Sequence, residues 1–255
     1  MKENLENLDL QFWKWFPQGI KNPSKINYYL NQRSDWLDHK IINRFEELEL
    51  HKNFGLFAIG GYGKKEIFPA SDIDISIIQI NSKHDNYENL EIFIAFLWDF
   101  GHKVGHSVRT KNDIKKIITS DVKEFTSYLT FRPLSANTKS IEILKDVLKN
   151  KEKIFTINKF FTKKKNEQNE RYKSFDSTEF NLEPDLKESP GSLRDYQTAS
   201  WILNHCFKIS SDAEIKKSNF FNAQELASIN NAYDFIKLLR YSINLLQTSS
   251  RNRLN

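Results

Sequence analysis

The chain has 255 residues, of which 39% are hydrophobic, and a formal net charge of +5. This size and composition predict one large or two small globular domains. No apolar run approaches the roughly 18 residues of a membrane span and the N-terminus lacks a signal-peptide core, so we expect a cytoplasmic protein with no membrane partner.

The single cysteine and the one dense basic run bear on two further classes of protein, those with a reactive or disulfide-bonded cysteine and those that bind nucleic acid. Cys206 cannot form an internal disulfide, and its place in an apolar helical stretch predicts a buried structural thiol rather than a nucleophile. The basic excess fits an anionic substrate or nucleic acid. However, the run KKK at 163–165 is typical of a solvated helix face, so nucleic-acid binding is not expected.

The N-terminal part shows helical periodicity after an irregular start. Residues 1–23 are aromatic and irregular, and the segment FWKWFP (12–17) fits either a short helix or a docking segment. From Ser24, a suitable N-cap, to about His51, apolar residues recur at helical spacing. This pattern predicts one long or broken helix packed beside a sheet.

The most informative segment joins a glycine turn to two carboxylates. An apolar strand, 54–60, ends in the sequence GGYG (60–63), and a period-2 strand follows at 72–80. Asp72 and Asp74 open that second strand. Residues i and i+2 of a strand point to the same face about 6.6 Å apart, so both carboxylates can aim at one point. Their repulsion requires a cation, and Mg²⁺ is predicted because it prefers a few carboxylates together with phosphate oxygens.

This segment differs from two common phosphate-binding motifs. No Gly-Lys-Ser/Thr follows at the P-loop spacing, and Glu66 stands where a dinucleotide fingerprint has its third glycine. Glycines let backbone N–H groups approach a polyphosphate, and two ions about 3.5–4 Å apart can clamp the oxygens of an in-line displacement. Either half alone is typical of a solvated strand or a simple turn. Together they predict nucleotidyl transfer.

The remaining elements are predicted to be mostly helical. A short helix is expected around 63–68, a polar loop at 81–87, a core helix from Leu90 to Gly101 and a third strand at 103–110. From residue 111 onward the pattern predicts helices separated by short breaks, with Pro133 closing one, a main loop at 183–190, a helix starting at Asp212 and a final helix over 222–249. A sheet followed by helices predicts an α+β fold.

The third strand carries two candidate residues. Arg109 could hold a triphosphate or stabilise charge as pyrophosphate leaves, and a surface ion pair is the equal alternative. His106 fits a general base or a structural histidine. The strand offers no Asp or Glu, so the general base stays unassigned.

The main loop offers charged candidates beside a proline. Glu183 or Asp185 could supply a further carboxylate by folding over the active site, although a domain connector is the slightly preferred interpretation. Ser189 and Pro190 are then expected to open a helix whose free N–H groups could meet phosphate. Arg194 is expected to pair with the nucleotide or with the neighbouring Asp195.

Three segments carry a resemblance to a known family. The sequences GGYGKKEIFPASDID (60–74), VGHSVRT (104–110) and NLEPDLKESPGSLRD (181–195) resemble those of the PII-protein uridylyltransferases, the bifunctional uridylyltransferase/uridylyl-removing enzymes of bacterial nitrogen regulation. The segment SRNRL (250–254) resembles the end of that family's transferase region, so the likeness runs from about residue 25 to the C-terminus. The family has Gly-Gly where this chain has Gly191-Ser192, which puts the geometry of that turn in question if the second position needs a positive φ.

The resemblance implies a small, mixed-sheet nucleotidyltransferase domain of the DNA polymerase β-like type. With the predicted elements, it gives an N-terminal extension (1–24), a nucleotidyltransferase domain (25–135) and an all-helical domain (136–255). It also implies Mg-dependent transfer of UMP from UTP to a tyrosine of the PII signalling protein, with release of pyrophosphate. The expected site residues are Asp72 and Asp74 for catalysis and metal binding, Gly60, Gly61, Gly63, Lys64, Ser71 and Arg109 for the nucleotide, and His106, Glu183, Asp185 and Arg194 as further candidates.

Two alternatives remain open at this point. One is a nucleotidyltransferase with another nucleotide or acceptor, and the other is a non-catalytic remnant that binds nucleotide or a partner. In the family, an HD hydrolase domain and two ACT domains follow the transferase region, whereas this chain stops at Asn255. Removal of UMP and sensing of glutamine through those domains are therefore expected to be missing.

Overall fold

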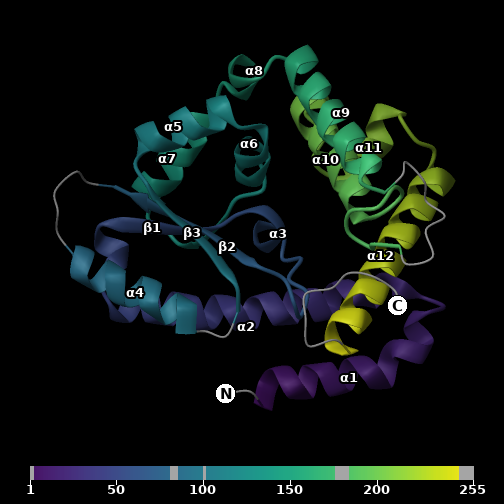
Figure 1. The fold of residues 1–255 in the computed structure, drawn as a ribbon, viewed down its shortest axis with the longest axis horizontal. Coiled ribbons are helices and arrows are strands. Elements are labelled where there is room, and N and C mark those ends of the chain that lie inside the picture. Colours follow the sequence, from purple (N-terminus) through teal and green to yellow (C-terminus); the bar gives the residue numbers. More distant parts are fainter. Residues whose placement is uncertain (1–2, 81–85, 100–101, 176–183, 247–255) are drawn as a thin grey trace. The chain divides into compact units, whose positions relative to one another are not determined.

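The computed structural model describes residues 3–80, 86–99, 102–175 and 184–246 (Figure 1). The chain forms two compact units, Leu30–Ile154, here the sheet unit, and Met1–Tyr29 with Phe155–Asn255, here the helical unit. The predicted domain boundaries remain predictions. The elements of the described residues are α1 (Glu3–Gly19), α2 (Ile26–Glu47), β1 (Phe54–Ala58), α3 (Gly60–Gly63), β2 (Ile73–Gln79), α4 (Tyr87–Asp99), β3 (Val104–Arg109), α5 (Lys111–Ser120), α6 (Val122–Tyr128), β4 (Arg132–Ser135), α7 (Thr138–Leu148), α8 (Lys151–Ile154), α9 (Ile157–Lys173), α10 (Leu193–Phe207), α11 (Asp212–Ser218) and α12 (Ala223–Leu246), with 3-10 turns at Pro23–Lys25 and Leu50–Lys52.

The sheet unit is built on a four-stranded mixed sheet in the order β3-β2-β1-β4. β2 pairs with β3 in parallel, and β1 pairs antiparallel with both β2 and β4. The three predicted strands are present, each two residues shorter than expected, and the predicted α+β class is confirmed.

The fourth strand was not predicted. Pro133 was expected to close a helix, but it lies inside β4 and pairs with Phe57 of β1. Proline has no N–H to donate, so it is tolerated on a sheet edge, where β4 lies. A strand of only four residues has too short a pattern to be separated from a helix terminus by periodicity.

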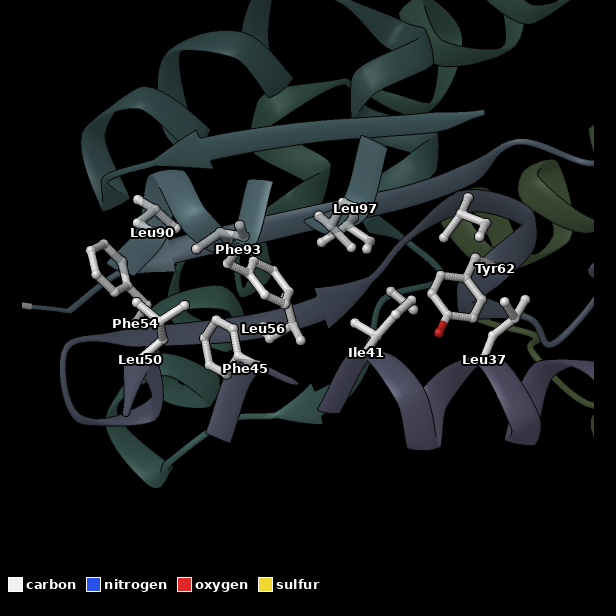
Figure 2. Packing of buried hydrophobic residues seen from close by; sticks show 14 of the residues in the cluster. Leu37, Ile41, Phe45, Leu50, Phe54, Leu56, Tyr62, Leu90, Phe93 and Leu97 are labelled. Atoms are coloured by element: carbon white, nitrogen blue, oxygen red, sulfur yellow. The ribbon is translucent and has the colours of Figure 1, made fainter. Parts of the chain in front are cut away.

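The two faces of the sheet are covered by different helices. Figure 1 shows α2 and α4 on one face and α5, α6 and α7 on the other. Alternate residues of β2 divide between these faces: Ile73, Ile75 and Ile77 are buried in the core shared with α2 and α4, so Asp74 and Ser76 face the opposite side. Figure 2 shows this core, in which each fully buried Leu, Ile or Phe side chain contributes roughly 1.5–3 kcal/mol. Its members are Leu37, Ile41, Phe45, Leu50, Phe54, Leu56, Ala58, Tyr62, Ile67, Ile73, Ile75, Ile77, Leu90, Phe93 and Leu97.

The helical unit corrects the prediction for the N-terminal segment. Residues 1–23 were expected to be irregular, with a short helix or a docking segment at 12–17, but Glu3–Gly19 form one helix, α1, which contains Pro17. Phe12 of α1 is fully buried, and its ring lies 5.4 Å from that of Tyr29 and 4.5 Å from that of Tyr241. The aromatic residues that obscured the helical pattern are therefore the ones that tie α1 to α12.

Three further expectations are adjusted. Ser24 is not an N-cap but lies inside the 3-10 turn that precedes α2. The run 163–165 is not a uniformly solvated face, because Lys164 is buried over the ring of Trp201 and bonds to Glu167. Cys206 lies in α10 as expected but is only half-buried. Among the described residues, none of the helices combines the length and the apolar character of a membrane span.

Candidate active site

The two aspartates of the predicted motif lie at the start of β2. Ile73, between them, is fully buried in the core, so the side chains of Asp72 and Asp74 lie on the opposite side of the strand, away from α2 and α4. The Asp72 side chain is 46% exposed, and its ion pair with Lys103 is long, at 3.5 Å between Nζ and Oδ2. The pair therefore shares one side of the strand, as the spacing predicted.

Asp74 lies between two glycines from different segments. A Cβ added to Gly60 would stand 3.2 Å from Asp74 Oδ2, and a Cβ added to Gly105 of β3 would stand 2.7 Å from Asp74 Oδ1. The second distance is shorter than Cβ atoms show, so any side chain at position 105 would force the Asp74 carboxylate to move. The glycine turn and the carboxylate are thus at the same place in the sheet unit. Gly105 was missed in the sequence, where a glycine inside a strand was the available signal.

The glycine turn itself is α3, a single helical turn. Gly60 has φ = +60°, which an L side chain rarely adopts. A Cβ at Gly63 would stand 1.9 Å from the carbonyl oxygen of Thr130, so this glycine permits close backbone packing. A Cβ at Gly61 would meet nothing closer than 3.7 Å. Gly60 and Gly63 are therefore required by the fold, whereas Gly61 has no steric requirement within the chain.

The short helix predicted at 63–68 is wrong in its position. The helical turn lies within the glycine motif, and Lys65, with φ = +58°, follows it. Lys65 forms an ion pair with Asp35 of α2. Lys64 is half-buried at the C-cap of α3. Ser71 closes a turn in which its Oγ accepts a hydrogen bond from the Phe68 N–H at 3.1 Å.

A partly buried polar network holds the glycine turn to α2 and β4. The Tyr62 hydroxyl donates to Asp38 Oδ1 at 2.6 Å, and Arg132 donates to both oxygens of Asp38, at 2.6 and 3.1 Å. Arg132 also donates to the Tyr62 carbonyl at 3.2 Å. Figure 2 shows the Tyr62 ring beside Leu37 and Ile41 of α2. Burial, followed by the charge of Asp38, raises the pKa of Tyr62 far above its ordinary value, so its hydroxyl remains a proton donor.

Arg109 lies on the same face of the sheet as Asp74 but further along it. It pairs with Ile78 in the register, four residues after the pair Asp74–Gly105, which is about 13 Å along the strands. Its Nη1 donates to Glu124 at 2.6 Å and to the Tyr128 hydroxyl at 3.1 Å. Burial opposes the charge, but these bonds raise the pKa of Arg109 above its ordinary value. This ion pair supports the structural alternative for Arg109.

His106 lies on the other face of the sheet. It pairs with Ile75 in the register, and paired residues of parallel strands share a face, so His106 is on the side of α2 and α4. Its ring contacts that of Trp98 in α4, with centroids 5.9 Å apart. Asp74 faces the opposite side, so this placement supports the structural alternative for His106.

The described charged candidates of the helical unit, Asp185 and Arg194, bond to other groups of their own loop and helix, and Arg194 pairs with Glu188 rather than with Asp195. Arg194 donates to both oxygens of Glu188, at 2.8 and 3.3 Å, and to Gln197 at 3.0 Å. The Asp185 carboxylate accepts hydrogen bonds from the backbone N–H groups of Lys187 and Glu188, both at 2.8 Å. Glu183 lies outside the described residues.

The helix predicted to open at Ser189 and Pro190 begins later. α10 starts at Leu193 with Ser192 as its N-cap. The N–H groups of Leu193 and Arg194 donate to the carbonyls of Leu186 and Lys187, so these two first-turn donors are not available to phosphate. Gly191 adopts φ = +78° whereas Ser192 has φ = −92°. The replacement of the family's second glycine by Ser192 therefore causes no backbone strain.

Comparisons with known proteins find related sequences. A family model described as GlnD PII-uridylyltransferase matches residues 159–255. A bifunctional uridylyltransferase/uridylyl-removing enzyme of Haemophilus influenzae (strain PittEE) is 33% identical over 99% of the chain. The chain belongs to this uridylyltransferase family. Enzymes of the same name from Hydrogenovibrio crunogenus and Acinetobacter baumannii (strain ATCC 17978) are 34% and 31% identical over 90% and 94% of the chain. The chain spans between 26% and 29% of the length of these curated relatives.

The site contains the donor set expected for Mg²⁺, although it lacks a larger cluster. Among the described residues, no group of three or more His, Cys, Asp and Glu side chains is placed to hold a metal ion. Two carboxylates on one side of a strand, one of them nearly half exposed, nevertheless fit an ion that keeps several waters and takes phosphate oxygens as its other ligands.

Proposed function

We propose that the sheet unit is a nucleotidyltransferase that transfers UMP from UTP to a protein hydroxyl and releases pyrophosphate. The observation that carries the proposal is the position of the Asp74 carboxylate between Gly60 and Gly105, which brings a carboxylate and a glycine turn to one point. Phosphoryl transfer requires a backbone turn that can approach the phosphates and, next to it, a carboxylate that can bind the metal ion.

Each part of the site has a role in this proposal. Asp72 and Asp74 would hold Mg²⁺, which when bound offsets the negative charge of the triphosphate. The backbone of Gly60–Gly63 would lie against the phosphates, and Gly61 is the position where the chain imposes no steric requirement of its own. Lys64 follows the glycine turn and Ser71 precedes Asp72, so both would lie near the bound nucleotide. The hydrogen bonds of Tyr62 would hold the turn in position for the phosphates.

The reaction is an in-line substitution at phosphorus. The acceptor oxygen forms a bond to the α-phosphorus while the bond to the bridging oxygen breaks, and pyrophosphate leaves with that electron pair. The proton of the acceptor hydroxyl passes to water. UTP is proposed from the names of the relatives, and the PII protein from the family description. A tyrosine as the acceptor follows from the resemblance. The residues of the site favour positioning and charge stabilisation over covalent catalysis.

Transfer of label from UTP tests the proposal directly. The chain is incubated with α-phosphate-labelled UTP, PII protein and Mg²⁺, and labelled PII protein is expected. Asp74→Asn should abolish transfer, whereas Asp146→Asn, a half-exposed aspartate of the same unit paired with Lys111, should not. Absence of transfer by the unmodified chain, or full transfer by Asp74→Asn, would contradict the proposal.

A non-catalytic nucleotide-binding module is the second candidate. The absence of a third acidic ligand among the described residues favours it, because many nucleotidyltransferases carry one. Calorimetric titration with UTP separates the two. Binding that requires Mg²⁺ supports the transferase, and binding that is independent of Mg²⁺ supports the module. Replacing UTP by the other three nucleoside triphosphates in the same titration tests the choice of base.

A further inference from the structure

The outer edge of β3 is the feature that leads beyond the proposed function. β3 is the last strand on its side of the sheet, and it pairs only with β2 among the described residues. It is also poorly buried for a strand: Gly105 is exposed, and Val108 is 37% exposed. An exposed edge of this kind is a template for a further strand.

The register identifies which backbone groups face outward. The Ile73 N–H of the sheet donates to the Lys103 carbonyl at 2.9 Å. Because alternate residues of a parallel strand bond to the same neighbour, Gly105, Ser107 and Arg109 also direct their backbone groups to β2. The N–H and C=O groups of Val104, His106 and Val108 therefore point away from the sheet. No hydrogen bond from a described residue reaches them.

This edge is adjacent to the candidate site. Gly105 has no side chain, and the Asp74 carboxylate lies directly against it, at 2.7 Å from where its Cβ would stand. A strand added to β3 would lie about 4.8 Å further out, on the other side of Gly105 from Asp74. An aromatic or long side chain can reach the diagonal neighbours of an adjacent strand, so such a side chain could pass over Gly105 to the carboxylate.

The surroundings of the edge indicate the character of the added strand. Between residues 102 and 116 the chain has five Lys or Arg residues and one acidic residue. Arg109 and Lys111 are paired with Glu124 and Asp146, so the positive charge of this edge comes from Lys115, Lys116 and the weakly paired Lys103. Lys115 and Lys116 are exposed, and the Lys103 side chain is 83% exposed. On the opposite face of the same edge, Trp98 is 65% exposed beside His106. These features complement an extended segment with acidic residues and an apolar side chain.

We propose that the protein acceptor presents its target hydroxyl from an extended, acidic segment that adds to β3 as a fifth strand. The segment would pair with the outward backbone groups of Val104, His106 and Val108, and it would direct the target side chain over Gly105 to Asp74. This inference rests on the proposed function, because it assigns the acceptor of the same site. In this mode of binding, the main-chain hydrogen bonds of the added strand provide affinity, and the side chains of the acceptor segment provide specificity.

Replacement of Val108 by proline tests the proposal. Val108→Pro removes one outward N–H but none of the bonds to β2, a position where strands tolerate proline. Val108→Ala is the matched control. With PII protein as the acceptor, the KM for PII should rise at least about tenfold in Val108→Pro and by less than about twofold in Val108→Ala. The calorimetric Kd for UTP should be the same in both variants, which shows that the site itself is intact.

Amide hydrogen exchange tests the docking of the acceptor independently of its modification. Addition of PII protein should slow exchange at Val104, His106 and Val108 even if no label is transferred, in which case the docking holds and the transferase proposal fails. Equal KM values for the two variants, or unchanged exchange at the three amides, would overturn the inference. So would a concentration-dependent dimer in sedimentation that Val108→Pro abolishes, because a second copy of the chain would then occupy the edge.

Discussion

The two units use aspartates of the same chemical type in opposite ways. In the helical unit, Asp195 accepts hydrogen bonds from Arg171, Gln168, Tyr172 and the Gly191 N–H, so both of its oxygens are occupied. In the sheet unit, Asp72 is nearly half exposed and has one long ion pair with a flexible lysine. A carboxylate whose oxygens are all bonded stabilises the fold, whereas one held at the end of a strand with few partners remains available to a ligand.

Among the variants that compare the two units, Asp72→Asn is expected to have the largest effect on activity. The amide keeps the size of the side chain but removes the charge that the metal and triphosphate require, so transfer of label should fall at least about 100-fold. The urea midpoint should stay the same, since a surface substitution with one weak ion pair changes stability by at most about 0.5 kcal/mol. If Asp72→Asn lost stability in parallel with transfer, Asp72 would be a fold-stabilising carboxylate like Asp195, and the comparison would fail.

Gly105→Ala and Gly191→Ala compare a glycine from each unit. At Gly105 the new methyl group collides with Asp74, so we expect transfer to fall about tenfold or more, with the carboxylate displaced. At Gly191 a methyl group meets nothing within 4 Å but φ is +78°, so stability should fall by about 1–2 kcal/mol and transfer should not change. Kinetics and urea unfolding of both variants measure this contrast. Unchanged transfer in Gly105→Ala would show that the position of the Asp74 carboxylate does not matter for the reaction.

Asp195→Asn should reverse the pattern seen for Asp72. We expect a loss of roughly 2 kcal/mol of unfolding free energy at neutral pH, because Arg171 and Tyr172 lose a charged acceptor. Burial works against the charged form, but the hydrogen bonds from Tyr172 and Arg171 lower the pKa of Asp195 in the folded state.

The pH dependence follows from the direction of that shift. A lowered folded-state pKa stabilises the protein above the unfolded value of about 3.9, and this contribution is lost as the pH falls through the lower folded value. The unmodified chain should therefore lose stability below about pH 4 more steeply than Asp195→Asn. Urea unfolding between pH 3 and 7 provides the measurement, and identical slopes for the two proteins would contradict the assignment.

The part of the site that the sequence predicted is the part made of neighbouring residues. The spacing of Asp72 and Asp74 and the glycine run were sufficient, because a period-2 strand and a turn are local properties. The anchoring of that turn could not be predicted. Tyr62 bonds to a residue 24 positions earlier, and Arg132 to residues 70 and 94 positions earlier, and no local pattern encodes such pairs.

The errors at helix starts have a similar origin. Ser189 and Pro190 have the residue types of a helix start, but Asp185 caps two N–H groups ahead of them and forms a turn instead. The helix then begins only after Gly191, whose positive φ redirects the chain. Which of two suitable starts is used depends on the side chain that competes for the first N–H groups, and that is a property of the folded loop.

Arg109→Lys is expected to have the smallest effect, and it tests the role of the third strand. If Arg109 bound the triphosphate, loss of its planar, bidentate group would reduce transfer strongly. Its bonds to Glu124 and Tyr128 and its distance of about 13 Å along the strands from Gly105 instead predict a change in transfer of less than about threefold. Stability should fall by about 1 kcal/mol, because lysine cannot serve both partners with the same geometry. Glu124→Gln should cause a similar loss of stability if the ion pair is the function of Arg109. A tenfold loss of transfer in Arg109→Lys without that loss of stability would instead place the guanidinium on the nucleotide, and the site would then extend along the whole of β3.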